Sequence, residues 1–214
     1  NHIVTEDVPG SVMDRAVIVQ PLEMFEIECV ARGYLTGSGL VEYRENRAVC
    51  GNSLPDGLQD GSKLDKSIFT PATKADVGDH DINIDFESAA AIVGQEIAED
   101  LRATTLKLYD TAAEYALSRG IILADTKFEF GANTEGTITW GDEALTPDSS
   151  RFWELAGWTP GKSQPSFDKQ FVRDWLISSG WDKKSPPPEL PTEIIEKTAA
   201  RYEEAFERIT GNKF

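Results

Sequence analysis

One short segment concentrates the residues whose types and spacing could carry chemistry. Asp125, Lys127 and Glu129 alternate with Phe128 and Phe130. In a strand, successive side chains point to opposite faces, so the three charged groups share one face and the two rings share the other. We therefore expect a charged strand face lying over an aromatic core.

A second acidic position follows a short turn. Residues 133–136 contain a Gly and predict a hairpin, and with Trp140 facing the core this hairpin brings Glu129 and Asp142 side by side. Two such carboxylates repel each other unless a cation lies between them, and Mg²⁺ prefers hard oxygen ligands. Glu129 and Asp142 are the predicted metal ligands. A solvated charged face on a hairpin is the alternative that the pattern leaves open.

An anion site is predicted around a Thr-Gly-Ser-Gly run. Arg32 lies a few residues before residues 36–39, so a guanidinium, the Ser38 hydroxyl and backbone N–H groups could surround one phosphate. An ordinary strand end with a surface arginine explains the same residues. Arg151, Lys169 and Arg173 lie in later polar runs and could complete the pocket.

The run from 73 to 81 holds one histidine among three aspartates. Without a second histidine this composition does not predict a metal site. A loop that contacts substrate is the better interpretation, with Lys74, His80 and Asp81 as its candidates.

These side chains need strands and helices to position them. Interleaved apolar and polar residues predict a strand over 24–35, and further strands are expected over 121–124, 127–130 and 137–140. Helical spacing predicts helices over 86–93, 95–119 and 192–209, the last capped by Thr192, stopped by Gly211 and packed through Ile195, Ala199, Tyr202, Phe206 and Ile209. Residues 52–85 are expected to be mostly loop, with a short strand near 68–69.

Composition limits the partners. The chain has 21 basic and 37 acidic residues and a formal charge of -16, which disfavours nucleic acid and anionic membrane surfaces. An anionic substrate therefore needs a local basic pocket. No apolar run approaches the roughly 18 residues of a membrane helix, so a cytoplasmic protein is expected. Cys29 and Cys50 are predicted to be buried, reduced thiols.

At these residues the sequence resembles the SAICAR synthetase family. Residues 123–131, Leu-Ala-Asp-Thr-Lys-Phe-Glu-Phe-Gly, match the family signature, and residues 28–38 match a second motif in Arg32 and the Thr-Gly-Ser. The segments 69–74, 78–81, 142–151 and 168–173 look like further family blocks in the same order.

The resemblance implies an α+β fold in which an antiparallel sheet is flanked by helices, like the C-terminal lobe of an ATP-grasp or kinase-like enzyme. It implies that Mg-ATP phosphorylates the carboxylate of carboxyaminoimidazole ribotide (CAIR) and that the amine of L-aspartate then displaces phosphate. In this scheme Lys127 and Asp125 are catalytic candidates, and Glu129 and Asp142 hold Mg²⁺. Arg32, Ser38, Arg151, Lys169 and Arg173 hold the ribotide phosphate.

The resemblance also implies a division of the chain into three parts. Residues 1–22 would end an N-terminal ATP lobe whose Gly-rich part precedes Asn1, 23–182 would form the catalytic domain, and 183–214 a linker and packing helix. Two other functions stay open: an inositol-phosphate-type kinase, and a non-catalytic ribotide-binding fragment. The sequence leaves room for a homo-oligomer.

Overall fold

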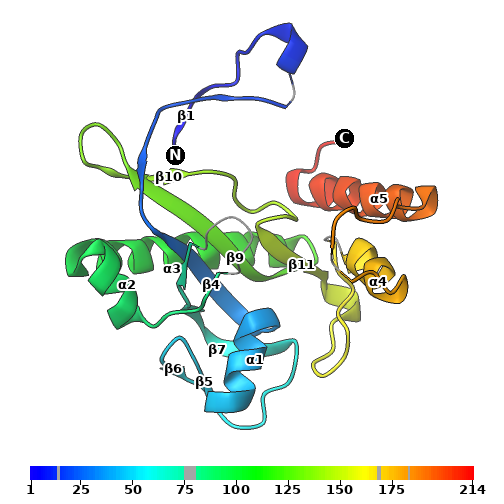
Figure 1. Ribbon diagram of the computed structural model, residues 1–214, viewed down its shortest axis with the longest axis horizontal. Coiled ribbons are helices and arrows are strands. Elements are labelled where there is room, and N and C mark those ends of the chain that lie inside the picture. Colours follow the sequence, from blue (N-terminus) through cyan, green and yellow to red (C-terminus); the bar gives the residue numbers. More distant parts are fainter. Residues whose placement is uncertain (14, 75–80, 168–169, 183) are drawn as a thin grey trace.

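The chain forms a main sheet with helices around it and two short two-stranded sheets, shown in Figure 1 as a computed structural model that describes residues 1–13, 15–74, 81–167, 170–182 and 184–214. The strands are β1 (Ile3–Thr5), β2 (Ile18–Val19), β3 (Glu23–Met24), β4 (Ile27–Leu35), β5 (Ala48–Val49), β6 (Asn52–Ser53), β7 (Ser62–Phe69), β8 (Ala72–Thr73), β9 (Ile121–Ala132), β10 (Ile138–Gly141) and β11 (Ser150–Glu154). The helices are α1 (Gly37–Asn46), α2 (Phe86–Val93), α3 (Gln95–Ser118), α4 (Gln170–Ser178) and α5 (Thr192–Thr210), with the 3-10 turns η1 (Gly10–Val12) and η2 (Leu155–Gly157).

The long strand β9 organises the main sheet. Within the described ranges this sheet contains seven strands, and all of their pairings are antiparallel. β3 and β4 pair with one edge of β9, while β10 and β11 pair with the other edge. β9 is therefore hydrogen-bonded along both edges, and its side chains have neighbours on both sides.

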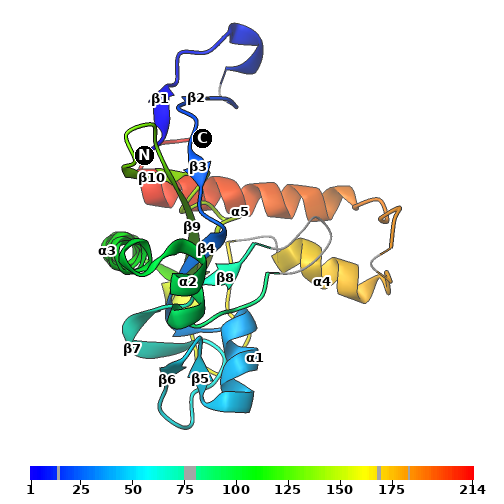
Figure 2. The same ribbon diagram turned by 60° about the vertical axis from the view of Figure 1, so that its left-hand side comes forward.

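The two faces of the sheet differ in chemistry. Phe128, Phe130 and Leu123 of β9 belong to the main apolar core, together with Leu101 and Tyr109 of α3. Figure 2 shows α3 on one side of β4 and β9 and α4 on the other. The face away from α3 carries the polar side chains of β9, so the predicted separation of charged and aromatic residues is confirmed.

Most predicted elements are present, with corrections. The helix over 86–93 is confirmed, and the helix predicted over 95–119 ends at Ser118. The two strands expected over 121–124 and 127–130 are one continuous strand, because neighbours on both edges keep Asp125 and Thr126 extended. β7 starts at Ser62 and is much longer than the short strand predicted near residues 68 and 69.

The last helix was predicted with the wrong cap and with an inner face that is only partly right, since Ile209 does pack against the main core. Pro191, not Thr192, is the N-cap residue, and it makes no side-chain capping bond. Ala205 is buried, whereas Ile195 and Phe206 are 52% and 39% exposed. The stripe is shifted because Arg208 packs over Phe167 and donates to the Gly120 carbonyl, which turns that side of α5 inward.

Two smaller predictions concern cysteines and membranes. Cys29 and Cys50 are both buried and free, as expected. Among the described residues, no helix combines the length and apolarity that crossing a bilayer requires. The division of the chain at residues 22 and 182 stays a prediction.

Candidate functional site

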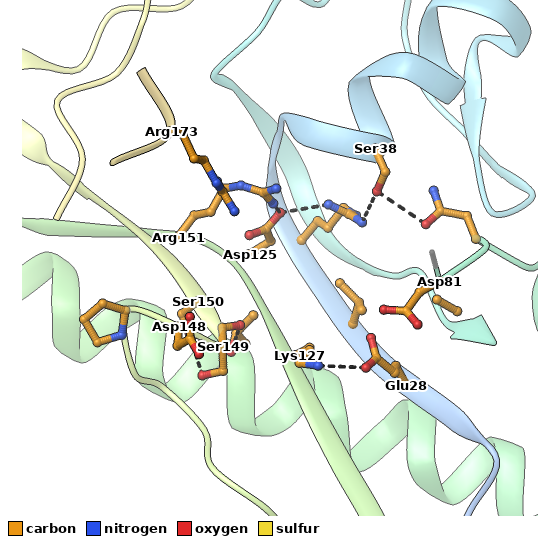
Figure 3. Close-up of a pocket in the computed structure, with 16 residues that line it drawn as sticks. Glu28, Ser38, Asp81, Asp125, Lys127, Asp148, Ser149, Ser150, Arg151 and Arg173 are labelled. Atoms are coloured by element: carbon orange, nitrogen blue, oxygen red, sulfur yellow. Dashed lines mark hydrogen bonds and ion pairs between the residues drawn. The ribbon is translucent and has the colours of Figure 1, made fainter. Parts of the chain in front are cut away.

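A polar cavity of about 540 Å³ opens on the face of the sheet opposite α3. Figure 3 shows the side chains that line it. Strands β4, β9 and β11, the start of α1 and a residue of α4 contribute its walls. The lining residues are Glu28, Val30, Arg32, Ser38, Ala72, Asp81, Asn83, Asp125, Thr126, Lys127, Pro147, Asp148, Ser149, Ser150, Arg151 and Arg173.

Two arginines share one carboxylate oxygen in this cavity. Arg32 on β4 and Arg151 on β11 are the direct cross-strand partners of Asp125 on β9, one from each edge. Oδ2 of Asp125 accepts from Nη1 of Arg32 at 2.8 Å and from Nη1 of Arg151 at 2.5 Å. Two guanidinium charges against one carboxylate leave a local excess of one positive charge, which can hold an anion despite the acidic chain.

Two further donors of Arg32 are also engaged. Nε donates to Thr70 Oγ1 at 2.9 Å, and Nη2 donates to Ser38 Oγ at 3.0 Å. Burying a charge is costly unless it is paired and hydrogen-bonded, and these contacts meet that condition. Arg32 is therefore held in one orientation, with Ser38 as its contact at the cavity.

The first turn of α1 lies beside the arginines. Thr36 is the N-cap residue, but its side chain makes no capping hydrogen bond. Gly37 has φ +55, and a Cβ there would lie 2.6 Å from Nη2 of Arg151; a Cβ on Gly39 would lie 3.3 Å from the Arg32 side chain. The two glycines let both guanidinium groups approach a helix N-terminus, a position that favours anions.

A row of alternating charges continues along the sheet from this corner. Lys127 Nζ lies 2.7 Å from Glu28 Oε1 and 3.9 Å from Glu129 Oε1, and Lys74 Nζ lies 2.7 Å from Glu129 Oε2. Burial raises the pKa of Glu28 above its ordinary value, although Lys127 opposes this. Burial lowers the pKa of Lys127, but the hydrogen bond and charge of Glu28 outweigh it, so the pKa is raised.

The predicted metal ligands lie on the neighbouring hairpin. Gly141 is the direct cross-strand partner of Glu129, and Asp142 is the next residue after Gly141. Asp142 is exposed and has φ 54. The described residues contain no group of three or more His, Cys, Asp or Glu side chains arranged around one point. Glu129 nevertheless already holds a cation, the Lys74 ammonium. Two carboxylates fit Mg²⁺ when phosphate oxygens and water supply the other ligands.

The predicted site residues apart from Asp142 divide into three groups. Arg32, Ser38, Asp125, Lys127, Arg151, Arg173 and Asp81 line the cavity. Lys74 and Glu129 are paired with each other, next to Lys127. His80 and Lys169 lie outside the described residues, so their predictions are untested.

Three residues of the site escaped the sequence analysis. Thr70 is fully buried and fixes Arg32, while Asn83 lines the cavity beside Ser38 and is bound by Glu42. A signal for Glu42 was present, since Ser38 and Glu42 are spaced four residues apart, one helical turn. Thr70 lies in the family block 69–74 but was given no role, and nothing marked Asn83; both roles arise from contacts distant in sequence.

The chain is similar in sequence to proteins of known family. Residues 1–188 match the family model described as SAICAR synthetase. A phosphoribosylaminoimidazole-succinocarboxamide synthase from Saccharopolyspora erythraea is 58% identical over 218 residues, which cover 99% of this chain and 73% of that protein. A protein of the same name from Streptomyces avermitilis is 59% identical over 219 residues, covering 99% and 73%.

Solved structures agree with the sequence comparison. The SAICAR synthase of Saccharomyces cerevisiae, in complex with SAICAR, superimposes with a TM-score of 0.89 at 37% identity, covering all of this chain and 75% of that one. A SAICAR synthetase in complex with ADP gives a TM-score of 0.66 at 27% identity, covering 100% and 73%. The likeness therefore extends over the whole fold that carries the cavity.

Proposed function

Because this chain belongs to the SAICAR synthetase family, ATP-dependent ligases of purine biosynthesis, we propose that its cavity binds the phosphate of CAIR between Arg32, Ser38 and Arg151. The observation that carries the proposal is the single Asp125 oxygen shared by two arginines. A dianionic phosphate needs more positive charge than negative charge around it, and this corner has that excess beside a helix N-terminus.

Asp125 acts in this proposal as a positioning residue. Its carboxylate is nearly buried, and Oδ2 pairs with both arginines. This pairing orients their other N–H groups toward the phosphate. Arg173 reaches the same cavity from α4 and adds a further cation. Lys169 remains a predicted member of this set.

The proposed reaction has two steps. The γ-phosphoryl group of ATP passes to a carboxylate oxygen of CAIR, which gives an acyl phosphate and ADP. The amine of L-aspartate then attacks the acyl carbon, the carbon–oxygen bond to phosphate breaks, and the amine loses its proton as the amide forms. Phosphoryl transfer depends chiefly on positioning and charge neutralisation, which is what a row of cations and carboxylates supplies.

Lys127 and the nearby carboxylates supply the cation and the possible metal ligands that this transfer requires. We propose that Lys127 lies beside the transferring phosphoryl group, held there by Glu28 at 2.7 Å. Glu129 and Asp142 would hold Mg²⁺, which supplies neutralisation of phosphate charge when bound. The ADP in a related structure supports nucleotide use in this fold. Lys74, His80 and Asp81 remain candidates for contacts to the imidazole or to aspartate, and a cytoplasmic location remains a prediction.

One assay tests the proposed function. Phosphate release is measured with ATP, CAIR and L-aspartate, and with each omitted in turn. Release that requires all three supports the ligase. Phosphorylation of an inositol phosphate without aspartate would point to the kinase, and ribotide binding without phosphate release would point to a binding fragment.

The phosphate corner has its own test. Arg32→Ala should weaken CAIR binding roughly 10- to 100-fold, because a hydrogen bond to a charged group contributes about 1.5–3 kcal/mol. Isothermal titration calorimetry with CAIR and with the nucleotide checks this. An effect on nucleotide binding alone would contradict the assignment.

A further inference from the structure

The side chain of Asn83 is held between two residues of one helix face. Ser38 and Glu42 are four residues apart on α1, so they lie one turn apart on the same side. Ser38 Oγ donates to Asn83 Oδ1 at 3.4 Å, and Asn83 Nδ2 donates to Glu42 Oε2 at 2.9 Å. The amide of Asn83 therefore spans the gap between the start of α1 and its second turn.

Glu42 decides which way this amide faces. An ionised carboxylate can only accept hydrogen bonds, so it must face the Asn83 amino group rather than the carbonyl. Its other oxygen, Oε1, accepts from the backbone N–H of Cys50 at 2.7 Å, which keeps the carboxylate from turning away. The carbonyl oxygen Oδ1 is thus fixed on the Ser38 side.

The backbone of Asn83 is equally constrained. It forms a bridge with Ala72 of β8, and the flanking bonds run from Thr73 N to Ile82 O at 3.0 Å and from Ile84 N to Pro71 O at 2.9 Å. Both ends of the side chain are therefore fixed relative to the cavity wall.

The fixed carbonyl has acceptor capacity left. A carbonyl oxygen has two lone pairs, and among the described residues Oδ1 of Asn83 accepts a hydrogen bond from Ser38 alone. At 3.4 Å that bond is longer than the usual range for O–H···O, so it contributes weakly. Because Asn83 lines the cavity, its carbonyl can accept from a ligand.

We infer that Asn83 is a specificity residue whose carbonyl accepts a hydrogen bond from an N–H group of a bound substrate, and that Glu42 is the positioning residue that keeps this acceptor turned to the cavity. The inference rests on the proposed function, in which two substrates carry such groups. These are the exocyclic amino group of the ribotide and the ammonium group of aspartate.

Glu42→Gln tests the inference without changing side-chain shape. The single Gln carbonyl must serve the Cys50 N–H, so the Gln amino group faces Asn83, whose amide then turns over. The cavity would present an N–H donor where it had an acceptor. Opposing a substrate N–H with another donor should weaken that substrate's binding about tenfold.

The experiment compares binding by titration calorimetry for three ligands. They are CAIR, the same ribotide with hydrogen in place of its exocyclic amino group, and L-aspartate added to the ribotide complex. Each is measured with the unmodified chain, Glu42→Gln and Asn83→Ala. Glu45→Gln is the matched control, because it removes the same charge from an exposed position of the same helix.

Selective outcomes support the inference. A loss of about tenfold for CAIR but not for its analogue assigns the acceptor to the ribotide amino group, and a loss confined to aspartate assigns it to the ammonium group. Equal losses for CAIR and the analogue with aspartate unchanged, or no loss in either variant, would overturn it. CAIR affinity that does not change in Arg32→Ala would instead contradict the proposed phosphate site. The comparison of CAIR with its analogue tests only the contact to the amino group, so the two failures can be told apart.

Discussion

Arg32 and Asp125 stand 93 positions apart in the sequence, yet Nη1 of Arg32 donates to Oδ2 of Asp125 at 2.8 Å in a nearly buried ion pair. Each side chain is 5% exposed. Removing one partner of such a pair lowers the stability of the fold, because the other charge is then buried without compensation.

Asp125→Ala should therefore lower the free energy of unfolding by about 3–5 kcal/mol, because two guanidinium groups would then face each other across a partly buried site. Denaturant titration followed by circular dichroism measures this. Asp65→Ala, an exposed aspartate on β7, is the control and should change stability by less than about 0.5 kcal/mol. Equal effects of the two substitutions would show that the Asp125 pairing contributes little.

Gly37→Ala separates backbone strain from the shape of the phosphate corner. Gly37 has φ +55, and an added Cβ would meet Nη2 of Arg151 at 2.6 Å. Gly136 has φ +75 with nothing within 4 Å of an added Cβ, so Gly136→Ala carries the strain without the clash. Both variants should lose about 1–2 kcal/mol of stability.

Only Gly37→Ala should weaken CAIR binding, by about fivefold or more. The added Cβ pushes the Arg151 guanidinium out of hydrogen-bonding distance of the phosphate. Titration calorimetry on both glycine variants checks the difference. Similar CAIR affinities in the two variants would mean that Arg151 does not need its place beside α1.

The metal assignment is tested by the dependence of nucleotide binding on Mg²⁺. Glu129→Gln and Asp142→Asn each remove one carboxylate charge, and each should reduce the gain in ADP affinity that Mg²⁺ produces by roughly tenfold. Affinities are compared with Mg²⁺ and with a chelator. Glu143→Gln, an exposed neighbour of Asp142, is the control. An unchanged Mg²⁺ effect in both variants would reject these ligands.

The two cysteines give a prediction about pH. Burial raises the pKa of Cys29 to about 12, and burial followed by the charge of Glu42 raises that of Cys50 to about 12. In the unfolded chain both pKa values return to an ordinary thiol value of about 8.5, so the thiols favour folding fully below that pH. This contribution is lost as the pH rises toward 12.

At pH 8 the folded chain should accordingly leave both thiols unmodified by a disulfide reagent, and the denatured chain should show both. Absorbance of the released chromophore follows the reaction. Rapid modification of the folded chain would show that the core around Cys29 or Cys50 opens readily.

The chemistry of the β9 strand could be predicted from its sequence. Alternation of Asp125, Lys127 and Glu129 with Phe128 and Phe130 determines two faces, since a strand has a period of two. Helices α2 and α3 were predicted almost to the residue, because their apolar spacing and the glycines that end them are local signals. The position of Arg32 near a Thr-Gly-Ser-Gly run likewise indicated an anion site.

Only the tertiary structure decided which residues meet. The register of β4, β9 and β11 sets Arg32 and Arg151 on either side of Asp125, and no local spacing encodes a register between distant strands. The same holds for Thr70 under Arg32 and for Asn83 beside α1. The sequence by itself determined which groups were available and which face of the strand they share. Long-range strand pairing determined which of them form hydrogen bonds and ion pairs with each other and line one cavity.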